Sequence, residues 1–170
     1  VNKNANACFP SNTGQGKVTF PLHLLAHGDF GGGIGLRAYK GLQKQIAEAN
    51  FVVVAWASCA VDNFCDNGEA SFLEAIKTIQ FLERNQDELP VDFHLPYSAS
   101  GHSTGARVVL MLAAIIDNLS YLEDTKYAPE LTPAVRQSLS KIKAVVADHA
   151  DPMDDPKQNP DILHWNITSV

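Results

Sequence analysis

The chain has 170 residues, of which 45% are hydrophobic and 19% are charged, a composition normal for one globular domain with a substantial core. A net charge of −6 without any basic run argues against nucleic acid or an anionic membrane as the main partner. No apolar stretch approaches the length of a membrane span, so we expect a soluble enzyme or binding domain without stable membrane insertion.

The first third of the chain predicts two strands and one helix. Residues 1–19 are polar and predict an irregular segment or the remnant of an edge strand. Residues 20–26 are typical of a short buried strand, which ends in the glycine-rich loop His27–Gly33. An amphipathic pattern predicts a helix over 36–50, and the β-branched run 51–56 predicts a strand buried on both faces. The expected apolar side of this helix comprises Leu36, Tyr39, Leu42, Ile46 and Ala47.

The remaining chain continues the alternation of strand and helix. A helix is expected over 69–85, a linker over 86–96, a strand over 97–101 and a second helix over about 104–118. A polar loop then leads to a short helix over 133–141 and a strand over 142–147. This order predicts the α/β class, with a mostly parallel sheet, helices on both faces and ligands at the carboxyl ends of the strands. The apolar side of the first of these helices is expected to comprise Phe72, Leu73, Ile76, Ile79 and Leu82.

The segment 101–105 carries the strongest functional signal, because it matches G-x-S-x-G between a strand and a helix. A serine on such a tight turn needs small neighbours, and Gly101 and Gly105 supply them. The N–H groups at the start of the helix suit the oxyanion of acyl transfer, so Ser103 is the candidate nucleophile. The alternative is an ordinary Gly/Ser turn before a buried helix.

The glycine-rich loop after the first strand has two interpretations. It can supply an oxyanion-hole N–H group from Asp29 or Phe30, or it can bind phosphate. Neither phosphate-binding glycine pattern fits it, which favours the first interpretation. His27 is interpreted as a structural hydrogen-bonding residue.

From about Phe20 to its end, the chain resembles the α/β-hydrolases. The resemblance rests on three features in the expected order: the strand that leads into His27-Gly28, the Ser103 turn and the strand that leads into Asp148. The chain looks most like the single-domain esterases that include chlorophyllases, platelet-activating-factor acetylhydrolases, dienelactone-hydrolase relatives and cutinase-like polyester hydrolases. The resemblance implies Ser103 as nucleophile and an oxyanion hole from the N–H groups of Thr104 and Asp29. It also implies a catalytic acid at Asp148, with Asp151 as the alternative.

The acidic loop after 147 has two further interpretations. Asp148, His149, Asp151, Asp154 and Asp155 can form a calcium site, although their spacing fits no known loop, or the segment is a solvated acidic loop. We expect no metal ion and no cofactor.

The base histidine has no clear candidate in this sequence. In hydrolases with the chain order Ser, Asp, His the base comes last, beyond two further strands. We therefore expect residues 20–170 to be the amino-terminal portion of one hydrolase domain, cleaved or split, with the carboxyl-terminal fragment as a second chain that supplies the base.

The expected reaction is hydrolysis of a small-molecule or lipid-like carboxylic ester through an acyl-enzyme on Ser103. Phe30, Trp56 and His102 are candidates for the substrate pocket, as are Phe64 and Trp165. The alternatives are a non-catalytic binding protein on the same scaffold and an acyltransferase that uses the same nucleophile.

Cysteines and sequons favour secretion. Cys59 and Cys65 can close a small disulfide loop, which leaves Cys8 without an assigned partner. Asn118 and Asn166 lie in N-glycosylation sequons. The alternative is that the cysteines are reduced and the sequons arise by chance.

Overall fold

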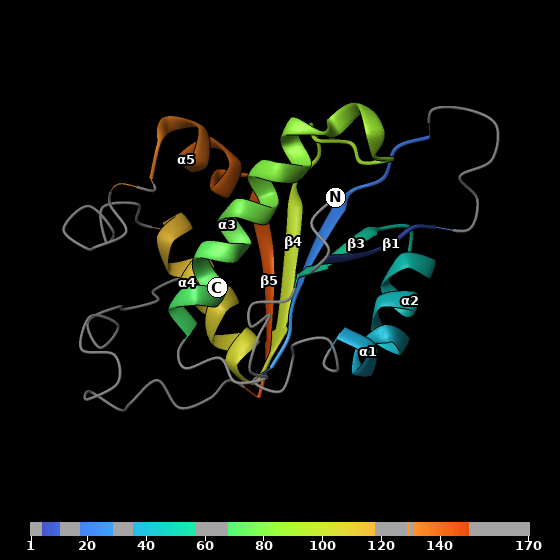
Figure 1. The fold of residues 1–170 in the computed structure, drawn as a ribbon, viewed down its shortest axis with the longest axis horizontal. Coiled ribbons are helices and arrows are strands. Elements are labelled where there is room, and N and C mark those ends of the chain that lie inside the picture. Colours follow the sequence, from blue (N-terminus) through green and yellow to red (C-terminus); the bar gives the residue numbers. More distant parts are fainter. Residues whose placement is uncertain are drawn as a thin grey trace.

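The computed structural model describes residues 5–10, 18–28, 36–56, 68–117, 129 and 131–149. Its centre is a five-stranded sheet in the order β1-β3-β2-β4-β5 (Figure 1). All neighbouring strands are parallel except β1, which pairs antiparallel with β3. The strands are β1 (Ala5–Cys8), β2 (Leu22–Ala26), β3 (Val52–Trp56), β4 (Tyr97–His102) and β5 (Ile142–Asp148). The predicted α/β class with a mostly parallel sheet is confirmed.

Strand β1 corrects one expectation about residues 1–19. Ala5–Cys8 is a regular edge strand, with Ala5 opposite Trp56 and Cys8 opposite Val53. The prediction of an irregular segment is therefore wrong for these four residues, and the edge-strand alternative is right. The amino-acid pattern does not indicate this strand, because small and polar residues such as Ala and Asn have weak strand preference and pair here through their backbone.

Helices cover both faces of the sheet. The helices α1 (Leu36–Ala38) and α2 (Lys40–Glu48) lie on one side, and α3 (Gly68–Arg84), α4 (Thr104–Asp117) and α5 (Pro133–Ser140) lie on the other (Figure 1). A short 3-10 helix, η2 (Gln86–Glu88), follows α3. The larger core lies beneath α3, α4 and α5, whereas α2 covers a smaller cluster over β2 and β3. Among the described helices, none is long and apolar enough to cross a membrane.

The helix expected over 36–50 is interrupted at Tyr39, which separates α1 from α2 and is the N-cap residue of α2. The expected apolar side is wrong at Leu42, whose side chain is 42% exposed, while Gln43 beside it is buried. The amide oxygen of Gln43 accepts a hydrogen bond from the Cys8 thiol at 3.5 Å. A buried amide with a partner replaces the apolar contact that periodicity alone predicts.

Helix α5 begins where its sequence signals place it. Thr132 is the N-cap residue, and its hydroxyl accepts a hydrogen bond from the Val135 N–H group at 3.3 Å. Pro133 follows at the first helical position, where its missing N–H group costs nothing.

A polar network around Glu83 joins α3, β4 and α5. The Glu83 carboxylate accepts hydrogen bonds from the Tyr97 hydroxyl at 2.7 Å, the Ser138 hydroxyl at 2.5 Å and the Lys141 ammonium at 2.8 Å. Burial alone would raise the pKa of Glu83, but these three donors and the charge of Lys141 hold it below its usual value. Burial, and after it the Glu83 carboxylate, raise the pKa of Tyr97.

A second polar contact lies inside the sheet, where His23 of β2 faces β4. Its Nδ1 and Nε2 atoms lie 2.8 Å and 2.7 Å from the hydroxyl oxygens of Ser98 and Ser100. Burial lowers the pKa of His23 to about 4, because an imidazolium loses its hydration there. His23 is therefore neutral at pH 7 and serves to join two central strands.

Candidate active site

Ser103 occupies a tight turn between β4, which ends at His102, and α4, which begins at Thr104. Its φ of 55° lies in the left-handed region, which is unfavourable for a residue with a Cβ atom. Its N–H group donates to the carbonyl oxygen of Asp148 at 3.0 Å, and its carbonyl oxygen accepts from Ala106 at 2.9 Å. The strained turn is thus held from β5 on one side and from α4 on the other.

The two glycines of the motif are required by close backbone contacts. A Cβ atom on Gly101 would lie 2.1 Å from the carbonyl oxygen of Gly105. A Cβ atom on Gly105 would lie 2.3 Å from the carbonyl oxygen of Ala26 in β2. Both distances are far below van der Waals contact, so α4 can pack this closely on β2 and β4 only with glycine at these positions.

The loop after β2 approaches Ser103 at Gly28. A Cβ atom on Gly28 would lie 3.1 Å from the Ser103 Cβ atom. His27 is buried, and its Nδ1 atom lies 2.6 Å from the Gly28 carbonyl oxygen, which fits the structural role expected for it. Asp29 and Phe30, the expected oxyanion-hole and pocket residues of this loop, lie outside the described residues. The other expected oxyanion donor, Thr104, is buried at the start of α4 directly after Ser103.

Tyr39 connects this loop to the serine turn. Its hydroxyl oxygen accepts a hydrogen bond from the Gly28 N–H group at 3.3 Å and lies 2.7 Å from Nδ1 of His102. Sequence reasoning placed Tyr39 only on the apolar side of a helix, so it missed this contact. The available signal was that Tyr39 carries a polar hydroxyl at the end of an apolar ring and follows the glycine-rich loop closely in the sequence. His102, expected at the pocket, is half-buried in this contact.

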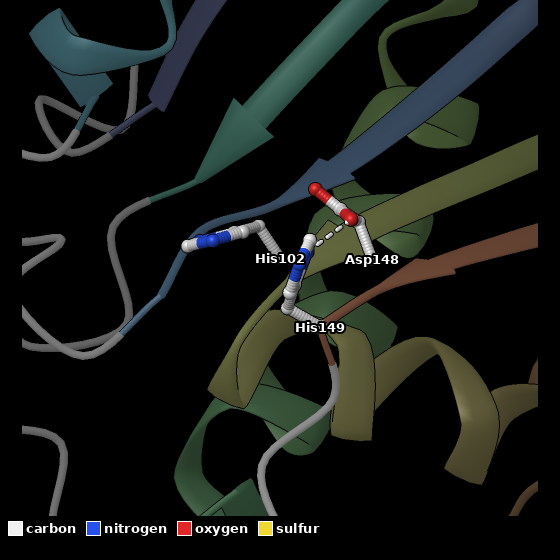
Figure 2. Close-up of side chains that lie close together, drawn as sticks. All are labelled: His102, Asp148 and His149. Atoms are coloured by element: carbon white, nitrogen blue, oxygen red, sulfur yellow. Dashed lines mark hydrogen bonds and ion pairs between the residues drawn. The ribbon is translucent and has the colours of Figure 1, made fainter.

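Asp148 and His149 end β5 next to the serine turn. The Asp148 carboxylate oxygen Oδ1 lies 2.5 Å from Nδ1 of His149, and both side chains are largely exposed. His149 has a φ of 50°, and its ring centroid lies 6.2 Å from that of His102. Figure 2 shows His102, Asp148 and His149 together at the ends of β4 and β5. The structure therefore places Asp148 beside the Ser103 turn and gives its carboxylate a histidine partner.

The expected pocket role of Trp56 does not fit its position. The side chain is 1% exposed and belongs to the large core, and its indole N–H group has no partner among the described residues. Alternation along β3 explains this, because Val52, Val54 and Trp56 share the face that α3 and α4 cover.

Several further predictions fall on residues outside the described ranges and remain predictions. Cys8 itself is a half-buried free thiol. Besides Asp29 and Phe30, these predictions concern the alternative acid Asp151, the calcium candidates Asp154 and Asp155, the pocket candidates Phe64 and Trp165, the proposed disulfide residues Cys59 and Cys65, and the sequon residues Asn118 and Asn166.

Comparison with protein-family models gives no match, and comparison with curated proteins gives none either. Solved structures do match, and three are representative. Esterase B from Lactobacillus rhamnosis, inhibited by a tributyrin phosphonate, has a TM-score of 0.56 at 11% identity over 92% of this chain and 47% of its own. Esterase 2 from Thermogutta terrifontis, phosphonylated by sarin, has a TM-score of 0.59 at 15% identity over 86% of this chain and 48% of its own.

The third structure is brefeldin A esterase, described as a bacterial homologue of human hormone-sensitive lipase. Its TM-score is 0.57 at 14% identity, over 94% of this chain and 40% of its own. The chain thus spans less than half the length of each of these three proteins. These matches, together with the sheet order and the glycine-flanked serine turn, show that the chain has the α/β-hydrolase fold.

Proposed function

We propose that this chain is part of a serine hydrolase that cleaves carboxylic esters through an acyl-enzyme on Ser103. One observation carries the proposal: Ser103 is held at positive φ on a turn that only flanking glycines permit, at the start of α4. Such strain persists only where the surrounding structure enforces it, and it exposes the hydroxyl at the carboxyl edge of a parallel sheet.

The reaction follows from this position. The Ser103 oxygen attacks the ester carbonyl while a base histidine accepts the hydroxyl proton. The N–H groups of Thr104 and Asp29 stabilise the oxyanion, helped by the positive end of the α4 dipole. The tetrahedral intermediate expels the alcohol, which takes the proton from the histidine. Water then attacks the acyl-enzyme by the same route and releases the acid.

The acid of the proposed triad is Asp148, with Asp151 as the alternative. Its place beside the Ser103 turn supports this role, since its carbonyl oxygen already accepts the Ser103 N–H group. We propose that the base comes from a carboxyl-terminal segment, either in the same polypeptide or as a second chain after processing. The short span of this chain relative to the matched esterases supports that arrangement.

The proposed substrate is a small-molecule or lipid-like ester. The matched structures are esterases, and one of them is described with a tributyrin phosphonate. The resemblance to chlorophyllases, acetylhydrolases and cutinase-like enzymes points to the same class. Phe30 and Phe64, which follow β2 and β3 in the sequence, remain the apolar candidates for the acyl pocket.

The test is hydrolysis of p-nitrophenyl butyrate by the full-length protein. Ser103→Ala should lower kcat/KM by at least about 10³-fold, because the nucleophile is lost while substrate binding remains. Ser140→Ala on α5 is the matched control, since Ser140 is exposed and bonds only locally to Gln137. Activity that is equal in both variants, or no hydrolysis by the parent protein, would contradict the proposal. A strong preference for an added alcohol over water would instead indicate an acyltransferase.

A further inference from the structure

Two histidines and one carboxylate meet beside Ser103 from two strands that are far apart in sequence. One ligand atom from each of His102, Asp148 and His149 lies within 4.8 Å of the other two. His102 directly precedes Ser103, and Asp148 accepts the Ser103 N–H group through its backbone. We propose that these three side chains form a binding site for a divalent transition-metal ion, Zn²⁺ in particular.

The hydrogen bonds around the two rings favour metal binding. Nδ1 of His149 lies 2.5 Å from Oδ1 of the Asp148 carboxylate, so a metal ion bound by both atoms would take the place of the proton between them. Nδ1 of His102 lies 2.7 Å from the Tyr39 hydroxyl, whose oxygen has two lone pairs and can accept from both His102 and Gly28. Metal binding at Nε2 of His102 would select that tautomer. A partner such as Tyr39 on the far ring nitrogen orients histidine ligands in known metal sites.

The geometry requires only small changes in distance. Zn²⁺ binds nitrogen and carboxylate oxygen at about 2.0–2.2 Å, so tetrahedral ligand atoms lie roughly 3.3 Å apart. The distance between His149 and Asp148 must lengthen from 2.5 Å, and the distances to His102, which are at most 4.8 Å, must shorten. Side-chain rotation permits this for Asp148 and His149, which are 61% and 83% exposed. His102 is the less mobile member, because Tyr39 holds it. Three protein ligands would leave the fourth tetrahedral position for water.

The donor set also selects the metal. Two imidazoles and one carboxylate suit Zn²⁺, Co²⁺ or Ni²⁺, whereas Ca²⁺ takes six to eight oxygen ligands. This site differs from the calcium loop considered from the sequence, because His102 of β4 replaces the acidic residues after 150.

The site has a consequence that rests on the proposed function. A metal ion on the Asp148 carboxylate would compete with the base histidine that this carboxylate orients, and it would stand beside the nucleophile. Zn²⁺ should therefore inhibit ester hydrolysis reversibly. Metal binding itself does not depend on that function, so the two can fail separately.

The binding test is calorimetric titration of the full-length protein with ZnCl₂, in a buffer free of chelator and thiol. We expect one site with a Kd on the order of 1–10 μM, that is, about −7 to −8 kcal/mol. His149→Asn should weaken binding at least tenfold. Asparagine tolerates the φ of 50° and can still donate to Asp148, but it lacks the imidazole lone pair. His94→Asn is the matched control, because His94 is an exposed histidine outside the cluster.

Co²⁺ and Ca²⁺ make the test sharper. Co²⁺ should give the visible absorption of a site with nitrogen and oxygen ligands, and EDTA should abolish it. Binding weaker than 1 mM, equal affinity in His149→Asn, a cobalt–thiolate charge-transfer band, or tighter binding of Ca²⁺ than of Zn²⁺ would each overturn the site. Zn²⁺ binding in a protein that hydrolyses no ester would support the site and overturn the proposed function. Zn²⁺ binding without inhibition of a working esterase would overturn only the regulatory consequence.

Discussion

His23 makes the stability of the fold depend on pH in a predictable window. Its ring lies between the hydroxyls of Ser98 and Ser100, and burial lowers its pKa to about 4. In the unfolded chain the same group titrates near 6.5. A lowered folded-state pKa means that the unfolded state binds the proton first as the pH falls. The contribution of His23 is therefore complete above about pH 6.5 and is lost between about pH 6.5 and pH 4.

The magnitude follows from the two pKa values, which differ by about 2.5. At 1.36 kcal/mol per pKa unit, the free energy of unfolding should fall by about 3 kcal/mol between pH 7 and pH 4 through His23 alone. That loss is a large share of the stability of a typical domain.

The assay is urea unfolding at a series of pH values for the parent protein and His23→Gln. Glutamine keeps an amide between the two serines but does not titrate in this range. The unfolding free energy of the parent minus that of His23→Gln should fall by about 3 kcal/mol from pH 7 to pH 4. The effect of the carboxyl groups cancels in this difference, because they titrate in both proteins. His94→Gln, at an exposed site, should give no such trend. Parallel curves for the parent and His23→Gln would show that protonation of His23 does not destabilise the fold between pH 7 and pH 4.

Three further predictions test the packing, the Glu83 network and the strain at Ser103, each by urea unfolding. Gly105→Ala should lower the free energy of unfolding by at least about 3 kcal/mol, because the added Cβ atom would lie 2.3 Å from a carbonyl oxygen of β2. As the control, Gly41→Ala in α2 should raise the free energy of unfolding by up to about 1 kcal/mol, because its Cβ atom would have nothing within 4 Å; similar effects of the two substitutions would contradict the packing. Glu83→Ala should lower the free energy of unfolding by about 2–4 kcal/mol, because three donors lose their acceptor. Glu74→Ala removes only an exposed ion pair and should lower it by less than about 1 kcal/mol, so equal losses would contradict the Glu83 network. Ser103→Gly should raise the free energy of unfolding by about 1 kcal/mol, because glycine tolerates the positive φ of this position, and it should abolish activity. A loss of stability would contradict backbone strain at Ser103.

Much of the fold could be predicted because its signals are local and periodic. The run 51–56 became β3, and the helix expected over 69–85 became α3, with Ile76, Ile79 and Leu82 buried as its spacing predicts. The serine turn was predictable for a different reason. Gly101 and Gly105 are required there because a Cβ atom at either position would overlap neighbouring backbone atoms.

The remaining features depend on contacts that no local pattern encodes. β1 pairs through its backbone, so its small and polar side chains do not mark it. Tyr39 reaches Gly28 and His102 only after α2, β2 and β4 have packed together. The cluster of His102 with His149 has the same origin, because parallel strands bring their carboxyl ends together whatever their separation in sequence.

The role proposed for Ser103 is that of an activated nucleophile. The direct measurement is intact-mass spectrometry of the full-length protein, non-reduced, before and after exposure to a fluorophosphonate probe, with peptide mapping of the adduct. We expect one adduct, located on Ser103 and absent from Ser103→Ala. A protein that stays unlabelled, or an adduct at another residue that persists in Ser103→Ala, would contradict it.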